Sequence, residues 1–122
     1  MDSGVMFNIL LILFLLWFVF RRFLSLQGVK QITTADLKSE LKNKDIQFID
    51  VRTPYEFRTR HIKGFENIPL TNLPHLTNQL SKDKEVFVIC QSGMRSLKAS
   101  NILKKQGFKN ITNIKGGMNT WY

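Results

Sequence analysis

The residues best suited to chemistry form one short stretch, which begins at Cys90 and continues through Gln91, Ser92, Gly93, Met94, Arg95 and Ser96. Cys90 ends an apolar run, and a helix is expected to leave the residues after it. A helix N-terminus offers free N–H groups and a positive dipole end, which can lower a cysteine pKa from about 8.5 to roughly 3.5–7.5. Gly93 lets the loop turn its amides inward as a nest, and Arg95 adds a permanent cation. The stretch therefore predicts a reactive thiolate in a loop that holds an anion or an anionic sulfur atom.

The alternative for Cys90 is a small buried hydrophobe at the end of a core strand, which is what most free cysteines are. The glycine and the arginine in the following loop favour the reactive thiol. Ser96 is expected to cap the helix, from where it can also hydrogen-bond the anion. Cys90 is the only cysteine, and the chain has two histidines, His61 and His75. The sequence therefore offers neither a disulfide nor a Cys/His metal cluster. We expect no metal and no cofactor.

The elements that must position this loop follow from the apolar pattern. Compact runs rich in β-branched and aromatic residues predict strands, and apolar residues at helical spacing predict helices between them. Strands that alternate with helices predict an α/β fold with a parallel sheet flanked by helices on both faces. Ligand chemistry then belongs at the carboxyl ends of the strands, where both Asp50 and Cys90 lie. The expected strands are 46–50, 85–90 and 111–114, and the expected helices start at Thr33 or Thr34, at Asn72 and after Cys90.

One transmembrane helix is expected to precede this domain. Val5 to Phe20 holds 16 residues of which only Asn8 is polar. As a helix this run is about 24 Å long, somewhat short of the roughly 30 Å hydrocarbon core. Arg21 and Arg22 can close the gap by snorkelling to the interface. We therefore expect a membrane anchor over residues 1–24, with the membrane contacted through residues 5–24, a linker over 25–30 and the folded domain over 31–122.

A cleaved signal peptide and an interfacial helix are the alternatives for this segment. A signal peptide should begin with positive charge and end in small residues, whereas Asp2 offsets the terminal amine and Arg21 and Arg22 follow Phe20 directly. The basic residues all come after the apolar run. The positive-inside rule then places the N-terminus outside and the domain in the cytoplasm.

The chain carries a formal charge of +9, from 18 basic and 9 acidic residues. The lysines of the domain are scattered, without the interleaved exposed aromatic residues of a nucleic-acid site. We therefore expect no nucleic-acid partner. Solvated lysines suit a surface near an anionic inner leaflet, and the positive field attracts small anionic substrates.

Three motifs occur in order along the domain. The first is Asp50-Val51-Arg52-Thr53-Pro54-Tyr55-Glu56-Phe57 with His61-Ile62-Lys63-Gly64 and Asn67-Ile68-Pro69, the second is Cys90-Gln91-Ser92-Gly93-Met94-Arg95, and the third is Gly116-Gly117-Met118-Asn119-Thr120-Trp121. Together they resemble the signatures of the rhodanese-like sulfurtransferases over about residues 30 to 122. Arg60 and Phe65 depart from the glycine and alanine that this family often has, at positions that concern loop packing.

The resemblance implies a persulfide shuttle. Cys90 would take the outer sulfur of a small donor such as thiosulfate or a persulfide and pass it to a thiophilic acceptor, either a thiol or an acceptor protein. Loop amides and Arg95 would stabilise the thiolate and the persulfide. Asp50 and Arg52 are possible supports behind the loop. Arg52 is expected to pair with an acid such as Glu56, and Gly116-Gly117 to form a tight turn.

Two other functions use the same residues. The first is a membrane-tethered persulfide relay or redox-sensing module that acts on a partner protein. The second is a phosphatase or arsenate reductase on a related fold. Cysteine phosphatases generally place an arginine six positions after the nucleophile, whereas here Arg95 comes one position sooner and Ser96 occupies the sixth. The shorter loop favours sulfur over phosphate.

Overall fold

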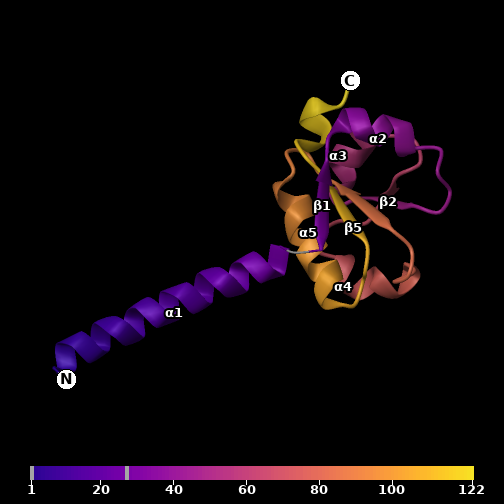
Figure 1. Cartoon of the computed structure of the whole chain (residues 1–122). Helices are drawn as coiled ribbons and strands as arrows, with labels where there is room; N and C mark the ends of the chain where they lie inside the picture. The colour runs from indigo at the N-terminus through magenta and orange to yellow at the C-terminus, as the bar shows by residue number, and fades with distance from the viewer. Residues whose placement is uncertain (1, 27) are drawn as a thin grey trace.

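The computed structural model describes residues 2–26 and 28–122, so Met1 of the expected anchor and Gln27 of the expected linker lie outside the described residues (Figure 1). The centre of the domain is a five-stranded sheet of order β1-β5-β4-β2-β3, in which every neighbouring pair is parallel. The strands are β1 (Val29–Ile32), β2 (Gln47–Asp50), β3 (Glu66–Asn67), β4 (Val86–Ile89) and β5 (Ile111–Ile114). The buried central strands β4 and β5 show no exposed side chains, as expected for a sheet covered on both faces.

Helices cover both faces of this sheet. On one face, α4 (Leu73–Leu76) and α5 (Met94–Lys105) enclose a core that includes Val88, Cys90 and Leu103. On the other face, α2 (Thr34–Glu40) and α3 (Pro54–Thr59) cover a second core with Leu37 and Phe48. Two 3-10 turns, η1 (Thr77–Gln79) and η2 (Gly117–Thr120), complete the fold. The predicted α/β fold with helices on both faces is confirmed.

Local signals account for the helix starts. Thr33 caps α2 through a capping box with Asp36, so Thr33 rather than Thr34 is the cap. Asn72 precedes α4, where Pro74 lies in the first turn. The unpredicted helix α3 has the same kind of signal, since Thr53 and Glu56 form a capping box around Pro54. The capping residues Thr53 and Glu56 could be read in the sequence. The helix itself was harder to predict, because α3 buries no residue fully and therefore lacks apolar residues at helical spacing.

The two edge strands, β1 and β3, were not predicted. β1 starts at Val29, inside the expected linker of residues 25–30, and α1 reaches Leu26. Both strands are short and partly exposed, and β1 exposes its two central residues. An edge strand with one partner needs little apolar sequence, because backbone pairing with β5 or β2 supplies most of its contacts.

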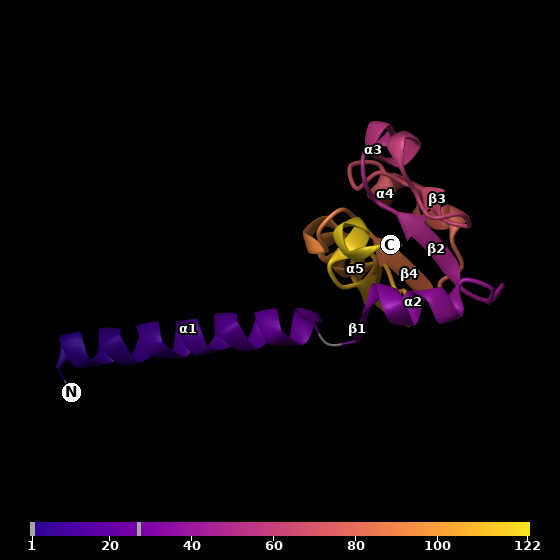
Figure 2. The ribbon, with the colours of Figure 1, turned by 90° about the horizontal axis from the view of Figure 1, so that it is seen from above.

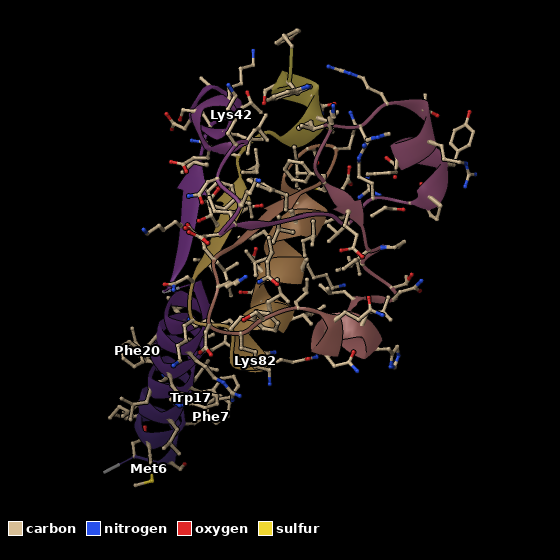
Figure 3. The ribbon with its side chains drawn as sticks, turned by 90° about the vertical axis from the view of Figure 1, so that its right-hand side faces the viewer. Met6, Phe7, Trp17, Phe20, Lys42 and Lys82 are labelled. Carbon is tan, nitrogen blue, oxygen red and sulfur yellow. The ribbon has the colours of Figure 1, made fainter. Side chains whose placement is uncertain are left out.

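The N-terminal helix α1 (Ser3–Leu26) extends away from the domain in both views (Figure 1, Figure 2). Its segment Ser3–Arg21 is long and apolar enough to cross a membrane, and none of it is buried against the domain. Phe7, Trp17 and Phe20 project from it and are each more than half exposed (Figure 3). By length and composition α1 is a candidate membrane span, and a signal sequence near an N-terminus has the same properties.

Because all strands run in the same direction, they begin at one edge of the sheet and end at the opposite edge. α1 leads into the start of β1, so it joins the domain at the edge where the strands begin (Figure 1). We call this the amino edge. Asp50 ends β2 and Cys90 directly follows β4, at the opposite edge. The loop that carries Cys90 therefore lies on the side of the sheet away from α1.

Candidate functional site

Cys90 lies fully buried between the end of β4 and the start of α5. Its Sγ accepts a hydrogen bond from the backbone N–H of Gly93 at 3.0 Å. Gly93 has a φ of +101°, a conformation that favours glycine, and it turns the chain into α5. The sulfur thus lies at the N-terminus of a 12-residue helix, where free N–H groups and the helix dipole stabilise negative charge.

Ser96 belongs to the same pocket around the sulfur but does not cap the helix. The N-cap is Gly93, so the predicted capping role of Ser96 is wrong. Ser96 lies in the first turn of α5, fully buried, with its Oγ 3.3 Å from the Cys90 Sγ. The hydroxyl also lies 3.2 Å from the carbonyl of Gly93, to which it can donate. One hydroxyl proton serves both positions, so Ser96 can turn its donor toward the sulfur when the sulfur is charged.

Arg95 does not face the sulfur as a free cation. Its Nη1 and Nη2 donate to Oε1 and Oε2 of Glu56, at 2.7 and 2.9 Å. The hydrogen bond from Arg95 is the main reason that the pKa of Glu56 falls from its ordinary value of 4.5 to about 2. The same hydrogen bond, with a smaller contribution from the charge of Glu56, raises the pKa of Arg95. The loop cation is therefore shared with an acid 39 residues away in the chain.

This ion pair predicts a specific pH dependence of stability. The folded-state pKa of Glu56 is depressed, so its contribution is fully present above about pH 4.5 and is lost as the pH falls from there toward 2. The side chains of Arg95 and Glu56 are 37% and 28% exposed, and solvent screening limits the contribution to about 1 kcal/mol. Between pH 6 and pH 2, the free energy of unfolding of Glu56→Gln should therefore fall by about 1 kcal/mol less than that of the wild type, as measured by urea unfolding. Equal losses in the two proteins would show that the pair is energetically neutral.

Arg52 connects the first motif to the loop and pairs with an acid as predicted, but that acid is Asp50 and not Glu56. Its Nη2 pairs with Asp50 Oδ2 at 2.8 Å, and both side chains are almost completely buried. Its remaining donors reach the carbonyls of Arg60 and Glu56, at 2.6 and 3.3 Å, and Oε1 of Gln91 at 3.3 Å. Asp50 and Arg52 therefore hold β2, α3 and the loop together, and they contact the loop at Gln91.

We expect Arg52→Lys to disorder this connection despite the conserved charge. A lysine has three donors on one atom and cannot reproduce the planar fork that serves Asp50 on one side and Gln91 on the other. The buried Asp50 carboxylate would lose hydrogen bonds, at a cost of about 2–3 kcal/mol. Urea unfolding measures this cost, with the exposed Arg58 changed to lysine as the matched control. Equal stabilities of the two variants would remove Arg52 from its supporting role.

Sequence reasoning missed how the turn η2 supports the loop. The backbone N–H groups of Met118 and Asn119 donate to the carbonyls of Cys90 and Gln91, at 2.8 and 2.9 Å. The Gln91 side chain also donates to Asn119 Oδ1 at 2.6 Å. At Gly117 an added Cβ would lie 2.2 Å from the Cys90 carbonyl oxygen. The glycine pair is thus a close-packed support under the loop as well as a turn, and only the third motif pointed to it.

Access to the loop is through its exposed side. Ser92 is exposed, and Met94 is 74% exposed. A pocket of about 250 Å³ opens beside the loop, between α3 and η2. Its lining residues are Arg52, Tyr55, Glu56, Thr59, Arg60, Gln91 and Met118. Among residues 2–26 and 28–122, no group of three or more His, Cys, Asp or Glu side chains is placed to hold a metal ion.

Comparisons with known proteins agree with this arrangement. The family model described as "Rhodanese-like domain" matches residues 33–122. The chain is 45% identical over 75 residues to "Uncharacterized protein YqhL" of Bacillus subtilis, with 62% of this chain and 60% of that protein covered. It is 36% identical over 98 residues to "Putative sulfur carrier protein YrkF" of the same organism, with 80% and 49% covered. The chain thus spans less than two thirds of the length of each of these two relatives.

Other relatives match over nearly their whole length. "Putative sulfurtransferase YtwF" of Bacillus subtilis is 38% identical over 94 residues, which cover 76% of this chain and 90% of that protein. The crystal structure of a rhodanese-like domain protein from Staphylococcus aureus superimposes with a TM-score of 0.71 at 34% identity, over 76% of this chain and 91% of that one. Because the family model matches residues 33–122, which include the loop at the end of β4, the chain belongs to the rhodanese-like family.

Proposed function

We propose that the protein is a sulfurtransferase that carries a sulfane sulfur on Cys90. The observation that carries this proposal is the place of the Cys90 sulfur at the N-terminus of α5, with the Gly93 N–H directed at it from 3.0 Å. Relatives with names such as "Putative sulfurtransferase YtwF" and "Putative sulfur carrier protein YrkF" support sulfur as the group that is handled.

The proposed reaction has two steps. The Cys90 thiolate attacks the outer sulfur of thiosulfate, a bond forms between the two sulfurs, and the S–S bond of thiosulfate breaks so that sulfite leaves with the electron pair. A nucleophilic acceptor then attacks the outer sulfur of the Cys90 persulfide, and the thiolate is regenerated. No proton has to move in either step when the thiolate is already formed, so no general base is needed.

The surroundings of Cys90 match the charge that this reaction creates. The Gly93 N–H and the Ser96 hydroxyl can donate to the Cys90 sulfur while it is a thiolate, and to the same atom when it has become the inner sulfur of the persulfide. Arg95 lies at the outer side of the loop, where its pair with Glu56 fixes the orientation of the guanidinium. The Gly93 N–H is a preorganised donor, which costs little reorganisation when charge develops on the sulfur.

The loop length argues against phosphate ester hydrolysis. A phosphatase arginine grips two phosphoryl oxygens from the sixth position after the cysteine. Here that position is Ser96, which is fully buried beside the sulfur, and Arg95 is engaged by Glu56. A guanidinium that already binds a carboxylate has fewer donors to offer a phosphate.

We expect thiosulfate to add one sulfur atom to the purified full chain and cyanide to remove it, with thiocyanate as the product. Intact-mass analysis after each reagent measures both steps. Turnover of an aryl phosphate by the same preparation is expected to be negligible. Phosphatase turnover without any detectable persulfide would overturn the proposal.

A second candidate is a relay that exchanges sulfur with a partner protein. Outside α1, three large apolar side chains of the described residues are strongly exposed, namely Tyr55 at 73%, Met94 at 74% and Tyr122 at 90%. Tyr55 lines the pocket beside the loop, Met94 belongs to the loop, and Tyr122 follows Trp121, whose carbonyl accepts from Arg60. Exposed apolar groups around a reactive group favour contact with a macromolecule. Faster transfer from a protein persulfide than from thiosulfate would favour the relay.

We also propose that α1 is an uncleaved membrane anchor, with the N-terminus outside and the domain in the cytoplasm. A helix of 24 residues is about 36 Å long, enough to cross the roughly 30 Å hydrocarbon core. Positive charge follows the apolar run at Arg21, whose guanidinium lies 5.3 Å from the centre of the Trp17 ring, as suits an interface. Protease added outside intact cells should leave the domain whole and should degrade it once the cells are opened. The mass of the purified chain tests whether the segment is retained.

A further inference from the structure

The amino edge of the domain, where α1 joins, is rich in lysine. Because the strands are parallel, residues that precede or begin several strands gather there. We call the following set the basic edge: Lys30, Lys82, Lys84, Lys104, Lys105 and Lys109. Asp83 and Glu85 are the acidic residues interspersed among them in the 82–85 and 104–109 segments.

Contacts between these segments show that they form one surface. Lys104 Cε lies 3.9 Å from the position of a Cβ on Gly28, the residue before β1. The backbone N–H of Lys109 donates to the carbonyl of Lys82 at 3.4 Å, and the Lys82 side chain passes beside Gly107. A hollow of about 250 Å³ at the same edge lies between Lys30, Glu85 and Asn110. The end of α5 and the residues before β4 and β5 therefore meet at the start of β1.

The ion pair between Lys109 and Asp83 at this edge is longer than the two ion pairs around the loop. Around the loop, Asp50 pairs with Arg52 and Glu56 with Arg95, each at 2.7–2.8 Å. At the basic edge, Lys109 and Asp83 approach only to 3.7 Å and are 75% and 86% exposed. Such an exposed pair is weak and leaves both groups solvated. Glu85 accepts a hydrogen bond from Thr112 at 3.1 Å.

We propose that the basic edge binds the anionic phospholipid head groups of the bilayer that holds α1. This rests on the proposed membrane anchorage. α1 ends at Leu26 and β1 starts at Val29, so the chain between them can span only about 10 Å. That tether holds the basic edge close to the membrane surface, within a distance comparable to the Debye length of about 8 Å at physiological salt. Lysines at that distance from an anionic leaflet are attracted to it.

This contact gives the domain a defined orientation. The basic edge would face the bilayer, and the Cys90 loop, at the opposite ends of the same strands, would face the aqueous phase. Lys42, in contrast, lies at the end of the domain away from the start of β1, and Lys82 lies at the near end (Figure 3). Donors and acceptors of sulfur would therefore reach the loop from solution and not from the lipid surface.

Lysine footprinting of the full chain tests the orientation. The protein is placed in nanodiscs of phosphatidylcholine alone or of phosphatidylcholine with phosphatidylglycerol, and each lysine's rate of acetylation is measured by mass spectrometry. We expect Lys82, Lys84, Lys105 and Lys109 to react about threefold more slowly in the anionic discs, an effect that high salt removes. Lys42 and Lys63 should react equally in both. Equal rates for the basic edge in both kinds of disc would overturn the proposal.

A matched pair of charge variants adds a second test. The triple variant Lys82→Glu, Lys84→Glu, Lys109→Glu should abolish the slower acetylation of Lys105 in anionic discs. The triple variant Lys42→Glu, Lys63→Glu, Lys115→Glu makes the same change of net charge and should leave that protection in place, because Lys115 directly follows β5 at the opposite edge. Loss of protection in both variants would show that net charge, and not this edge, attracts the lipid.

The assay separates this proposal from the ones on which it is built. A chain that does not copurify with either kind of disc would refute the anchorage and the basic-edge contact together. Persulfide formation with thiosulfate, measured on the same samples, reports on the proposed sulfurtransferase alone. Circular dichroism of the same proteins shows that both triple variants are folded.

Discussion

Cys90→Ser is expected to abolish sulfur transfer while the domain stays folded. A serine oxygen cannot form a persulfide, and Cys90 is the only thiol in the chain, so no other residue can take its place. The hydroxyl is slightly smaller than the thiol and can accept from the Gly93 N–H, which now lies 3.0 Å from the sulfur. We expect no mass gain with thiosulfate and no thiocyanate from added cyanide.

Stability measurements make this result specific to the chemistry. The free energy of unfolding of Cys90→Ser should lie within about 1 kcal/mol of the wild type, because the change leaves the hydrogen-bonding pattern and most of the volume in place. A variant that still produced thiocyanate would contradict the persulfide mechanism. Inactivity together with a large loss of stability would instead assign Cys90 to the core.

Gly117→Ala is expected to displace the loop and reduce transfer by at least about tenfold, because a shift of about 1 Å at a reacting group has effects of that size or more. An added Cβ would lie 2.2 Å from the Cys90 carbonyl oxygen and 2.9 Å from the carbonyl carbon of Gln91. Both are backbone atoms, so the conflict cannot be relieved by rotating a side chain. The φ of +56° adds a smaller strain.

Gly64→Ala is the matched control. Gly64 also has a positive φ, of +99°, but nothing lies within 4 Å of an added Cβ. This variant should show only the strain of the backbone, about 1–2 kcal/mol, with transfer close to that of the wild type. Gly117→Ala should lose more stability than Gly64→Ala as well as activity. Similar activities of the two variants would show that η2 does not position the loop.

The balance between sequence and tertiary structure differs from motif to motif. The Cys90 loop could be predicted because its parts are contiguous. A strand end, a glycine with a positive φ and a helix start within five residues bring the sulfur and the Gly93 N–H together through local chain geometry alone. The same holds for α1, whose apolar run is readable without reference to the rest of the chain.

The partners of Arg52 and Arg95 depended on the folded chain. Glu56 lies four residues from Arg52, yet it points out of the first turn of α3, where its carboxylate caps Thr53 and meets Arg95. Asp50 and Arg52 are two residues apart at the end of β2, where alternate side chains share a side, so these two pair. Counting charges along the sequence did not distinguish these pairings, because both acids lie near Arg52.

By itself, the sequence determined the local geometry of the Cys90 loop, the order of the central strands and helices along the chain, and the apolar N-terminal helix, all of which arise from local geometry and from the period of apolar residues. Tertiary structure decided the order of the strands in the sheet, the two ion pairs and the contact of Gly117 with the Cys90 carbonyl. The contact of Gly117 with Cys90 and the pair of Arg95 with Glu56 join residues 27 and 39 positions apart, whereas the pair of Asp50 with Arg52 depends on the direction of nearby side chains. The physical reason is that a local pattern specifies which way a side chain points relative to its own element, whereas its partner depends on how that element packs against the others.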